Sequence, residues 1–500
     1  MELEIVTKDG RCTLTVRHAG ETLLELFQEN GIMQIPSPCG GNGTCGKCRV
    51  QVEGRGEVLA CRTEAEAGMT VCLEEEKASA IAEAGNCHLY PADGSRALAA
   101  ACDIGTTTVV CHLLDGKTGE RLGTVSAPNA QRIYGADVIS RIQASKGEGL
   151  SRLQGAAAGQ INGMLRELVR KTGRKEKIDL LAVAGNTVMS HLFAGISPES
   201  IGMAPFRPLS RFGDIRQAEK IGIENCREVY ISPAVAGYVG GDITADLLAV
   251  QMDTAGKETL LLDIGTNAEM VLGKDGDYVC CAAAAGPAFE GAEITMGMPA
   301  AVGAVSHVWM DGSKMRVSVI GGGEPDGICG SGLIDALAVF LKTGLMDETG
   351  RLTDEDEVEE EMAAYQGEDE NGNCVYLTEK IRVTQADVRK LQLAKAAVAA
   401  GIRILLDEKK MDIGDIGQVI LAGGFGSFLD KRSAAAVGLI PEELLGVTVS
   451  VGNAAGEGAV SAAISGQARR DLARIQNEMK YIELSANKKF SEKFMEQMFF

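Results

Sequence analysis

The chain has 500 residues, 45% of them hydrophobic and 24% charged, so disorder along the whole chain is excluded and several domains are expected. The net charge of −20 excludes nucleic acid as the main partner, because nothing here would neutralise a phosphate backbone. The sequence shows neither a basic leader nor an apolar run of membrane-spanning length, which indicates a cytoplasmic protein without a membrane partner. The fourteen cysteines are therefore expected to be thiols, some of them metal ligands, and not a disulfide framework.

Residues 1–75 are predicted to form a small β-rich domain. Residues 3–6 and 12–16 alternate as strands around a Lys-Asp-Gly turn, and residues 22–28 have helical apolar spacing. Residues 76–96 are weakly patterned, so we interpret them as a linker.

Four cysteines in this first region have the spacing C-x5-C-x2-C-x12-C: Cys39, Cys45, Cys48 and Cys61. Thiolates at this density indicate a soft metal. A structural zinc site is the alternative, although zinc ribbons usually present two Cys-x-x-Cys pairs and only Cys45 and Cys48 form one here. The string CGGNGTCGKC resembles the cluster loop of β-grasp ferredoxins, and this resemblance implies a [2Fe–2S] cluster.

The gap between the third and fourth ligands is shorter than is usual in the ferredoxins that the loop resembles. Cys72 therefore competes with Cys61 for the fourth position. Cys72 lies in the strand-like context MTVCLEE, which is typical of a sheet, so Cys61 is preferred.

From residue 97 the chain alternates between apolar strand and helix patterns, and an Asp-Ile-Gly-Thr turn occurs twice. Residues 103–108 and 263–267 each lie between apolar strands, about 160 residues apart, which indicates internal duplication. Glycine lets the turn bend, successive amides form an anion-binding nest, and the Thr hydroxyls add donors to phosphate. The leading carboxylates, Asp103 and Asp263, suit Mg²⁺.

Further motifs complete the set. Residues 423–426 (Gly-Gly-Phe-Gly) follow an apolar strand, where backbone can lie flat against a nucleoside. Asp242 lies in a double-glycine turn, GGDITAD. Residues 384–407 are predicted to form a helix with Thr384 as N-cap, and residues 354–361 an acidic, solvated surface segment.

Together these motifs resemble the actin/sugar-kinase/chaperone superfamily. The resemblance implies an α+β and α/β multidomain protein: a β-grasp ferredoxin domain, then a two-lobed ribonuclease-H-like ATPase with lobes at 97–258 and 259–500. It implies that Asp103, Asp242 and Asp263 are catalytic and that Mg-ATP is the nucleotide. The residues expected to bind ATP are Gly105, Thr106, Thr107, Thr108, Gly265, Thr266, Asn267, Gly423, Gly424, Phe425 and Gly426.

The combination with an N-terminal ferredoxin domain is similar to the reductive activators of corrinoid-dependent methyltransferases. Stretches such as MAPFRP (203–208) and GICGSGLIDALA (327–338) also match that family. The resemblance implies that one electron passes from the cluster to inactive Co(II) of a corrinoid protein, driven by ATP, with an external low-potential donor. A homodimer is compatible with it.

Two other functions stay open at this point. A small-molecule kinase with a fused redox regulator would hydrolyse ATP in response to a small substrate. A non-catalytic redox scaffold would bind ATP as a switch and lack ATPase activity. The activators of dehydratases resemble the chain less, because they lack a ferredoxin domain.

Several polar residues and thiols are expected to be structural. Asn129 and Asp137 are interpreted as caps, and His191 as a satisfied core histidine. The remaining cysteines in this group lack ligand spacing and are predicted to pack as small apolar residues: Cys280, Cys281 and Cys329.

Overall fold

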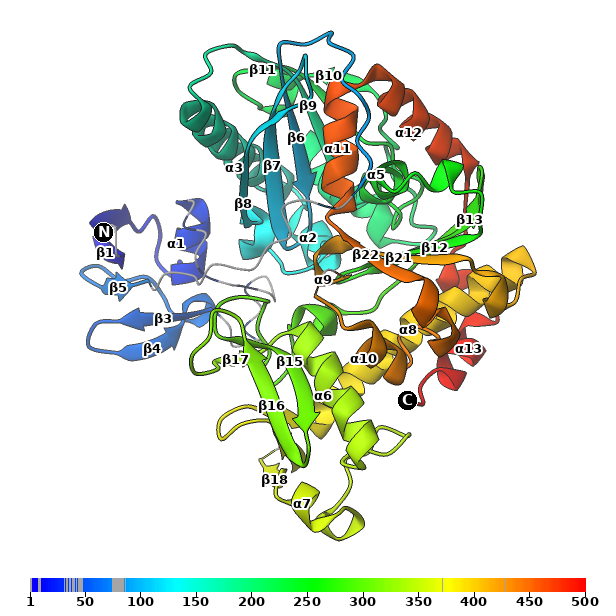
Figure 1. Ribbon diagram of the computed structural model, residues 1–500. Helices are drawn as coiled ribbons and strands as arrows, with labels where there is room; N and C mark the ends of the chain where they lie inside the picture. The colour runs from blue at the N-terminus through cyan, green and yellow to red at the C-terminus, as the bar shows by residue number, and fades with distance from the viewer. Residues whose placement is uncertain are drawn as a thin grey trace. The chain divides into compact units, whose positions relative to one another are not determined.

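The computed structural model describes residues 2–7, 10–30, 32, 35, 37, 41, 43, 48–73, 85, 87–370, 372–426 and 428–500 (Figure 1). The chain forms two compact units. The first comprises Met1–Lys77 and Pro91–Ser232, and the second comprises Ala78–Tyr90 and Pro233–Phe500. Among the described residues, no helix has the length and apolar character needed to cross a bilayer.

The N-terminal region of the first unit is a five-stranded mixed sheet with one helix. The strand order is β2-β1-β5-β3-β4, and β1 runs antiparallel to β2 and parallel to β5. The helix begins after Thr22, which forms a capping box with Glu25. Its apolar face contributes Leu23 and Phe27 to the core beneath the sheet. The elements are β1 Glu2–Thr7, β2 Gly10–Thr15, α1 Leu23–Glu29, β3 Arg49–Val52, β4 Gly56–Leu59 and β5 Thr70–Cys72.

The rest of the first unit is built on a six-stranded sheet of order β10-β11-β9-β6-β7-β8. Strands β11, β9 and β6 are parallel, and β7 and β8 continue the sheet as antiparallel hairpins. The strands are β6 Leu98–Ile104, β7 Thr108–Asp115, β8 Arg121–Pro128, β9 Ile178–Gly185, β10 Ile215–Gln217 and β11 Cys226–Ile231. The helices are α2 Val138–Ala144, α3 Gly149–Thr172 and α4 Thr187–Ala194.

The central sheet of the second unit repeats this plan. Its order is β22-β21-β12-β13-β14-β23, in which β22, β21 and β12 are parallel and β13 and β14 are antiparallel. Both Asp-Ile-Gly-Thr turns therefore follow the third parallel strand and open an antiparallel hairpin, as duplication predicts. The strands are β12 Thr259–Ile264, β13 Ala268–Lys274, β14 Asp277–Ala283, β21 Gln418–Ala422, β22 Thr448–Gly452 and β23 Met479–Tyr481.

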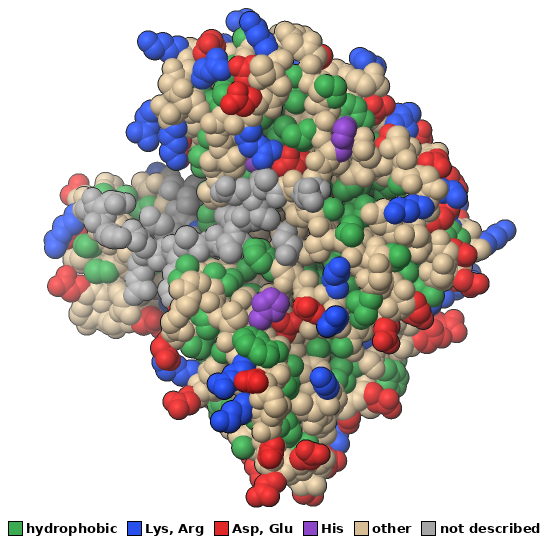
Figure 2. Space-filling view, viewed as in Figure 1, with side chains coloured by type: hydrophobic (Ala, Val, Ile, Leu, Met, Phe, Trp, Pro, Cys, Tyr) green, Lys and Arg blue, Asp and Glu red, His purple; other side chains and the backbone are tan. Residues whose placement is uncertain are grey.

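Helices and two small sheets complete the second unit. Thr384 caps the long helix α8 through a capping box with Asp387, which confirms that prediction. The acidic segment 354–361 is mostly exposed, and Figure 2 shows acidic side chains gathered over α7 and β18. The helices are α5 Gly241–Ala249, α6 Gly330–Thr343, α7 Glu360–Ala363, α8 Gln385–Lys409, α9 Gly423–Gly426, α10 Lys431–Ala436, α11 Ala454–Ile464, α12 Gly466–Glu478 and α13 Phe490–Glu496. The small sheets comprise β15 Ala304–Asp311, β16 Lys314–Val319 and β17 Gly327–Ile328, and β18 Gln366–Asp369, β19 Gly372–Tyr376 and β20 Arg382–Thr384.

Within the predicted linker, the described residues 85 and 87–90 belong to the second unit, whereas residues 91–96 belong to the first. The Gly85 amide donates to Glu457 Oε1 over 3.0 Å, and Gly85 forms a β-bridge with Gly452. The Tyr90 hydroxyl donates to Asp471 Oδ2 over 3.1 Å. We call residues 85 and 87–90 the strap, because hydrogen bonds tie Gly85 at one end to α11 and Tyr90 at the other end to α12.

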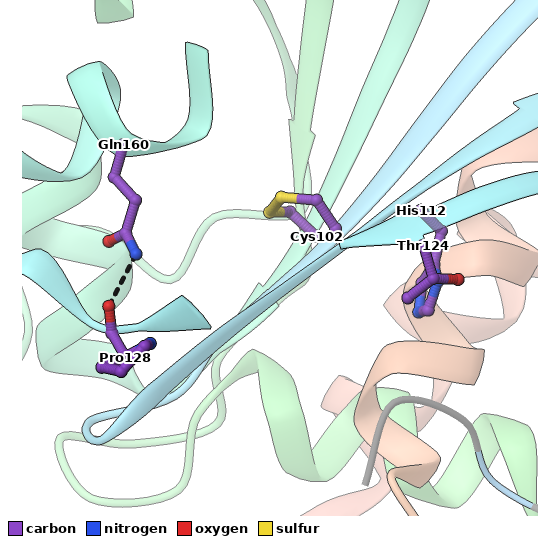
Figure 3. The surroundings of a disulfide bond; sticks show 6 residues. Cys102, His112, Thr124, Pro128 and Gln160 are labelled. Carbon is purple, nitrogen blue, oxygen red and sulfur yellow. Dashed lines mark hydrogen bonds between the residues drawn. A yellow bond between two sulfur atoms is a disulfide. The ribbon is translucent and has the colours of Figure 1, made fainter. Parts of the chain in front are cut away.

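The cysteines of the central sheets are buried. Cys280, Cys281 and Cys329 pack in the core, as predicted. Cys102 and Cys111 face each other across the β6–β7 hairpin and are joined by a disulfide, which the sequence analysis did not expect (Figure 3). Because 102 and 111 are directly opposed in the register, their side chains fall on the same face.

Candidate functional site

Two of the predicted cluster ligands lie side by side in the first unit. Cys48 immediately precedes β3, and Cys61 lies in the short 3₁₀ turn after β4. Their Sγ atoms are 3.2 Å apart, and Cys48 is 1% exposed. Cys39 and Cys45 lie outside the described residues. Cys72, the competing ligand, is exposed at the end of β5.

The residue after Cys61 fixes the cysteine loop to the sheet. Arg62 Nη2 donates to the carbonyl oxygen of Gly43 over 2.8 Å, and the Ala60 amide donates to the Cys48 carbonyl over 2.7 Å. Converging thiols next to a backbone held in this way fit a thiolate-bound metal centre. The described donors are thus compatible with the [2Fe–2S] cluster that the spacing predicts.

The first Asp-Ile-Gly-Thr turn joins β6 to β7, and neighbouring side chains hold its backbone. Asn129 Nδ2 donates to Gly105 O over 2.7 Å, and Arg141 Nη2 donates to Thr106 O over 2.6 Å. Asn186 Nδ2 donates to Thr106 Oγ1 over 3.0 Å. Bound carbonyl oxygens fix the conformation of the turn, which is what an anion-binding nest requires.

Of the three residues that hold this turn, only Asn129 was singled out from the sequence, and only as a cap. Asn129 and Asp137 are caps of the following helical segments, as predicted, but Asn129 additionally holds the turn. Arg141 and Asn186 were not singled out. Arg141 is fully buried in α2, and its place on the same helix face as the apolar residues Val138 and Ile142 is the sequence signal that could have identified it.

The second Asp-Ile-Gly-Thr turn joins β12 to β13 and is surrounded by carboxylates. Asp263, the penultimate residue of β12, interacts electrostatically with the carboxyl group of Asp246 on α5. Burial raises the pKa of Asp263 to about 6. Glu269 lies opposite Asp263 in the hairpin, and burial together with the charges of Asp242 and Asp263 raises the pKa of its carboxyl well above the usual range.

The sequence analysis found Asp242 and Asp263 but missed Asp246 and Glu269. Asp246 is four residues after Asp242 on α5, so both lie on one helix face, a spacing that could have revealed the pair. Each carboxylate makes it more costly for the others to ionise, and a divalent cation would relieve that repulsion.

Within the described ranges, no group of three or more His, Cys, Asp or Glu side chains is arranged to hold a metal ion by itself. Mg²⁺ at phosphate sites is commonly held by one or two carboxylates plus phosphates and water. Thr266 Oγ1 is buried and has no hydrogen-bond partner among the described residues. An unsatisfied hydroxyl in this turn fits a ligand that brings its own oxygen acceptors.

The Gly-Gly-Phe-Gly motif follows β21 at the same end of the sheet. Gly423 has φ +80°, and a Cβ there would lie 2.3 Å from Asp263 Oδ1, so only glycine lets the motif approach the carboxylate. The ring of Phe425 packs on Phe289 with centroids 5.2 Å apart. The backbone at Gly424 faces open space, as nucleoside contact would require.

Three family descriptions together match nearly the whole chain: "2Fe-2S iron-sulfur cluster binding domain" over residues 6–76, "RACo middle region" over 98–255, and "C-terminal domain of RACo the ASKHA domain" over 257–500. The "Corrinoid activation enzyme RamQ" of Eubacterium limosum is 35% identical over 413 residues, which is 79% of this chain and 69% of that protein. The chain belongs to the RACo family.

Two further RACo relatives agree. The "[Co(II) methylated amine-specific corrinoid protein] reductase" of Methanosarcina barkeri is 27% identical over 383 residues, covering 68% of this chain and 65% of that protein. A solved "Reductive activator for corrinoid,iron-sulfur protein" is 30% identical, with a TM-score of 0.73, and covers 100% of this chain and 98% of that one. The predicted family and the predicted fold class, a ferredoxin domain followed by a superfamily ATPase, are confirmed.

Proposed function

We propose that the chain is an ATP-dependent reductive activator that delivers one electron to inactive Co(II) in a corrinoid protein and so regenerates Co(I). One observation carries the proposal: a single chain combines the paired thiols of Cys48 and Cys61 with a carboxylate-lined glycine turn at Asp263. The names of the RACo relatives support the same activity.

The cluster would be held by Cys39, Cys45, Cys48 and Cys61, and when bound it supplies one-electron redox chemistry. Cys48 is buried, so its thiolate is shielded from water. Arg62, which holds Gly43, fixes the loop that carries the other cysteines. An external low-potential donor is required, because each turnover consumes one electron.

For the nucleotide, we propose that Asp263 binds Mg²⁺, that Asp242 orients water or the metal, and that Asp103 acts in the first turn. The two turns and residues 423–426 would contact the phosphates and the nucleoside. Asp246 would support Asp263, because the two carboxyl groups interact. The lobes proposed at 97–258 and 259–500 differ from the compact units, because residues 233–258 pack with the second unit.

ATP is needed because the electron transfer is uphill. A ferredoxin-type centre near about −400 mV does not readily reduce Co(II), and each ~59 mV costs about 1.4 kcal/mol for one electron. ATP drives the step only if its binding or hydrolysis has different free energies in the docked and released states. ATP turnover would thus separate the complex, or change cobalt ligation, and trap Co(I).

The test combines the protein, a reductant, ATP and a Co(II) corrinoid protein, and follows the absorption band of Co(I). The band should form with ATP and fail to form with the Asp263→Asn variant, whose cluster spectrum should be unchanged. Equal formation without ATP would overturn the coupling. ATPase activity stimulated by a small metabolite instead of the corrinoid protein would favour the kinase alternative, and light scattering would reveal a homodimer.

A further inference from the structure

A short exposed segment of the first unit, residues 203–212, combines apolar and basic side chains. We call it the docking loop. Met203 is 63% exposed and Leu209 66% exposed, among the highest values for large apolar side chains in the described residues. Arg207 and Arg211 are also exposed, and the Arg207 guanidinium forms no ion pair with any described residue. The net charge of the chain is −20, so the arginines of this loop are opposite in sign to the molecule as a whole.

The backbone of the docking loop is held in an uncommon conformation. Phe206 has φ +57° and Phe212 has φ +55°, in the left-handed region that bulky residues rarely adopt. The Phe206 amide donates to Met203 O over 2.7 Å, and Ser200 Oγ donates to Arg207 O over 2.6 Å. Strained backbone that is held by specific contacts is typical of binding sites.

A buried histidine anchors the docking loop to α4. His191 Nδ1 lies 2.7 Å from Thr187 O, to which it donates, and Nε2 accepts from the Ser210 amide over 3.2 Å. The ring of Phe212 packs edge-on against His191 at 5.0 Å, and Arg216 lies 5.1 Å above Phe212. The exposed side chains are therefore presented from a rigid base, which lowers the entropic cost of binding.

The docking loop lies at the edge of the sheet that carries the first phosphate turn. Gly213 N donates to Ile231 O at the carboxyl end of β11, over 3.0 Å. Asn186 is the N-cap of helix α4, which carries His191, and Asn186 also holds Thr106 of the turn. One helix thus contacts both the predicted nucleotide site and the docking loop.

We infer that the docking loop binds the corrinoid protein, inserting Met203 and Leu209 into an apolar depression whose acidic rim meets the arginines. The inference rests on the proposed function and names the surface through which the protein would act. Rigid apolar anchors in the centre with charges around them match the anatomy of protein–protein hot spots. The arginines would speed association and make it sensitive to salt.

The test compares Leu209→Asp and Arg207→Glu with two controls that make the same chemical change elsewhere. Met495→Asp alters an equally exposed side chain on α13, and Lys146→Glu alters an exposed lysine of the first unit. Binding is measured by calorimetry with a Co(II) corrinoid protein that the wild-type protein reduces. We expect each docking-loop variant to raise Kd at least about ten-fold, while the controls stay within about two-fold. ATPase activity without partner and the cluster spectrum should be unchanged in all four.

A photo-crosslinking amino acid at position 209 gives an independent measurement that does not depend on weakened binding. It should capture the corrinoid protein, and the same group at position 495 should not. Wild-type-like Kd for both docking-loop variants, or crosslinking only at position 495, would overturn the inference while leaving the proposed function intact. A wild-type protein that reduces no corrinoid protein would instead overturn the proposed function, and the inference with it.

Discussion

At the residue scale, Cys61 and Cys72 are the two candidates for the fourth ligand of the cluster. Cys61 Sγ lies 3.2 Å from Cys48 Sγ, whereas Cys72 is exposed on β5. We expect Cys61→Ala to abolish the absorption and electron paramagnetic resonance spectra of the [2Fe–2S] cluster, and Cys72→Ala to leave both intact. The opposite pattern would move the ligand to Cys72, and retained cluster in both variants would exclude both cysteines.

A second prediction at this scale concerns acid stability. His112 is fully buried beside Thr124, whose Oγ1 lies 2.8 Å from Nδ1 (Figure 3). Burial, with a smaller effect of Arg121, lowers the pKa of His112 to about 3. In the unfolded chain this pKa is near 6.5, so the unfolded state gains a proton first as the pH falls. Stability contributed by neutral His112 is present above pH 6.5 and is lost below it, by about 2 kcal/mol between pH 7 and pH 5.

Urea denaturation at pH 7 and pH 5, followed by circular dichroism, measures this loss. His112→Gln keeps a hydrogen-bonding side chain but cannot be protonated, so its free energy of unfolding should fall about 2 kcal/mol less than that of the wild type over this range. An identical fall in both proteins would show that His112 is accessible to protons in the folded state.

At the element scale, local motifs could be predicted from the sequence, and long-range packing could not. The two Asp-Ile-Gly-Thr hairpins, the Thr384 cap and strand β5 follow from residues within a few positions of one another. The pairing of Asp246 with Asp263 depends instead on how α5 packs beside β12. Similarly, nothing in the weak pattern of residues 76–96 indicates that Tyr90 contacts Asp471, because the partner is 381 residues away.

The strap gives a prediction at the same scale. A Cβ on Gly85 would lie 2.8 Å from Val451 O and 3.1 Å from Asn453 O, so Gly85→Ala should displace the strap from β22. Tyr90→Phe should remove the bond to Asp471, at a cost of about 1 kcal/mol. Hydrogen exchange should accelerate at residues 87–90 in both variants and remain unchanged in α3. Unchanged exchange at residues 87–90 would mean that the strap is held by other contacts.

At the scale of the whole molecule, function and stability oppose each other around Asp263. Its raised folded pKa means that the folded state keeps its proton while the unfolded state loses it above about pH 4, so stability falls as the pH rises towards 6. Without nucleotide at pH 8, Asp263→Asn should therefore raise the unfolding temperature, while ATPase activity is lost. Differential scanning fluorimetry across pH 5–8 measures this, and a lower unfolding temperature for Asp263→Asn at pH 8 would contradict it.

The overall architecture could be predicted because duplicated motifs and cysteine spacing are sequence patterns with few physical solutions. The compact units could not, because residues 233–258 continue the sequence of the first lobe yet fold onto the second unit. The exposure of individual side chains could not be predicted either, because nothing in the sequence MAPFRP (203–208) indicates that Met203 lies outside the core.

The packing of α5 on α11 also has a consequence for biosynthesis. Leu247 and Leu248 of α5 are fully buried in the second unit, but α11 begins about 200 residues later in the chain. At roughly 5–20 residues per second, a ribosome needs about 10–40 s to make that stretch. Throughout this interval the apolar side chains of α5 lack α11 to pack against, so the nascent chain is exposed to aggregation until its last hundred residues, which include α11, emerge.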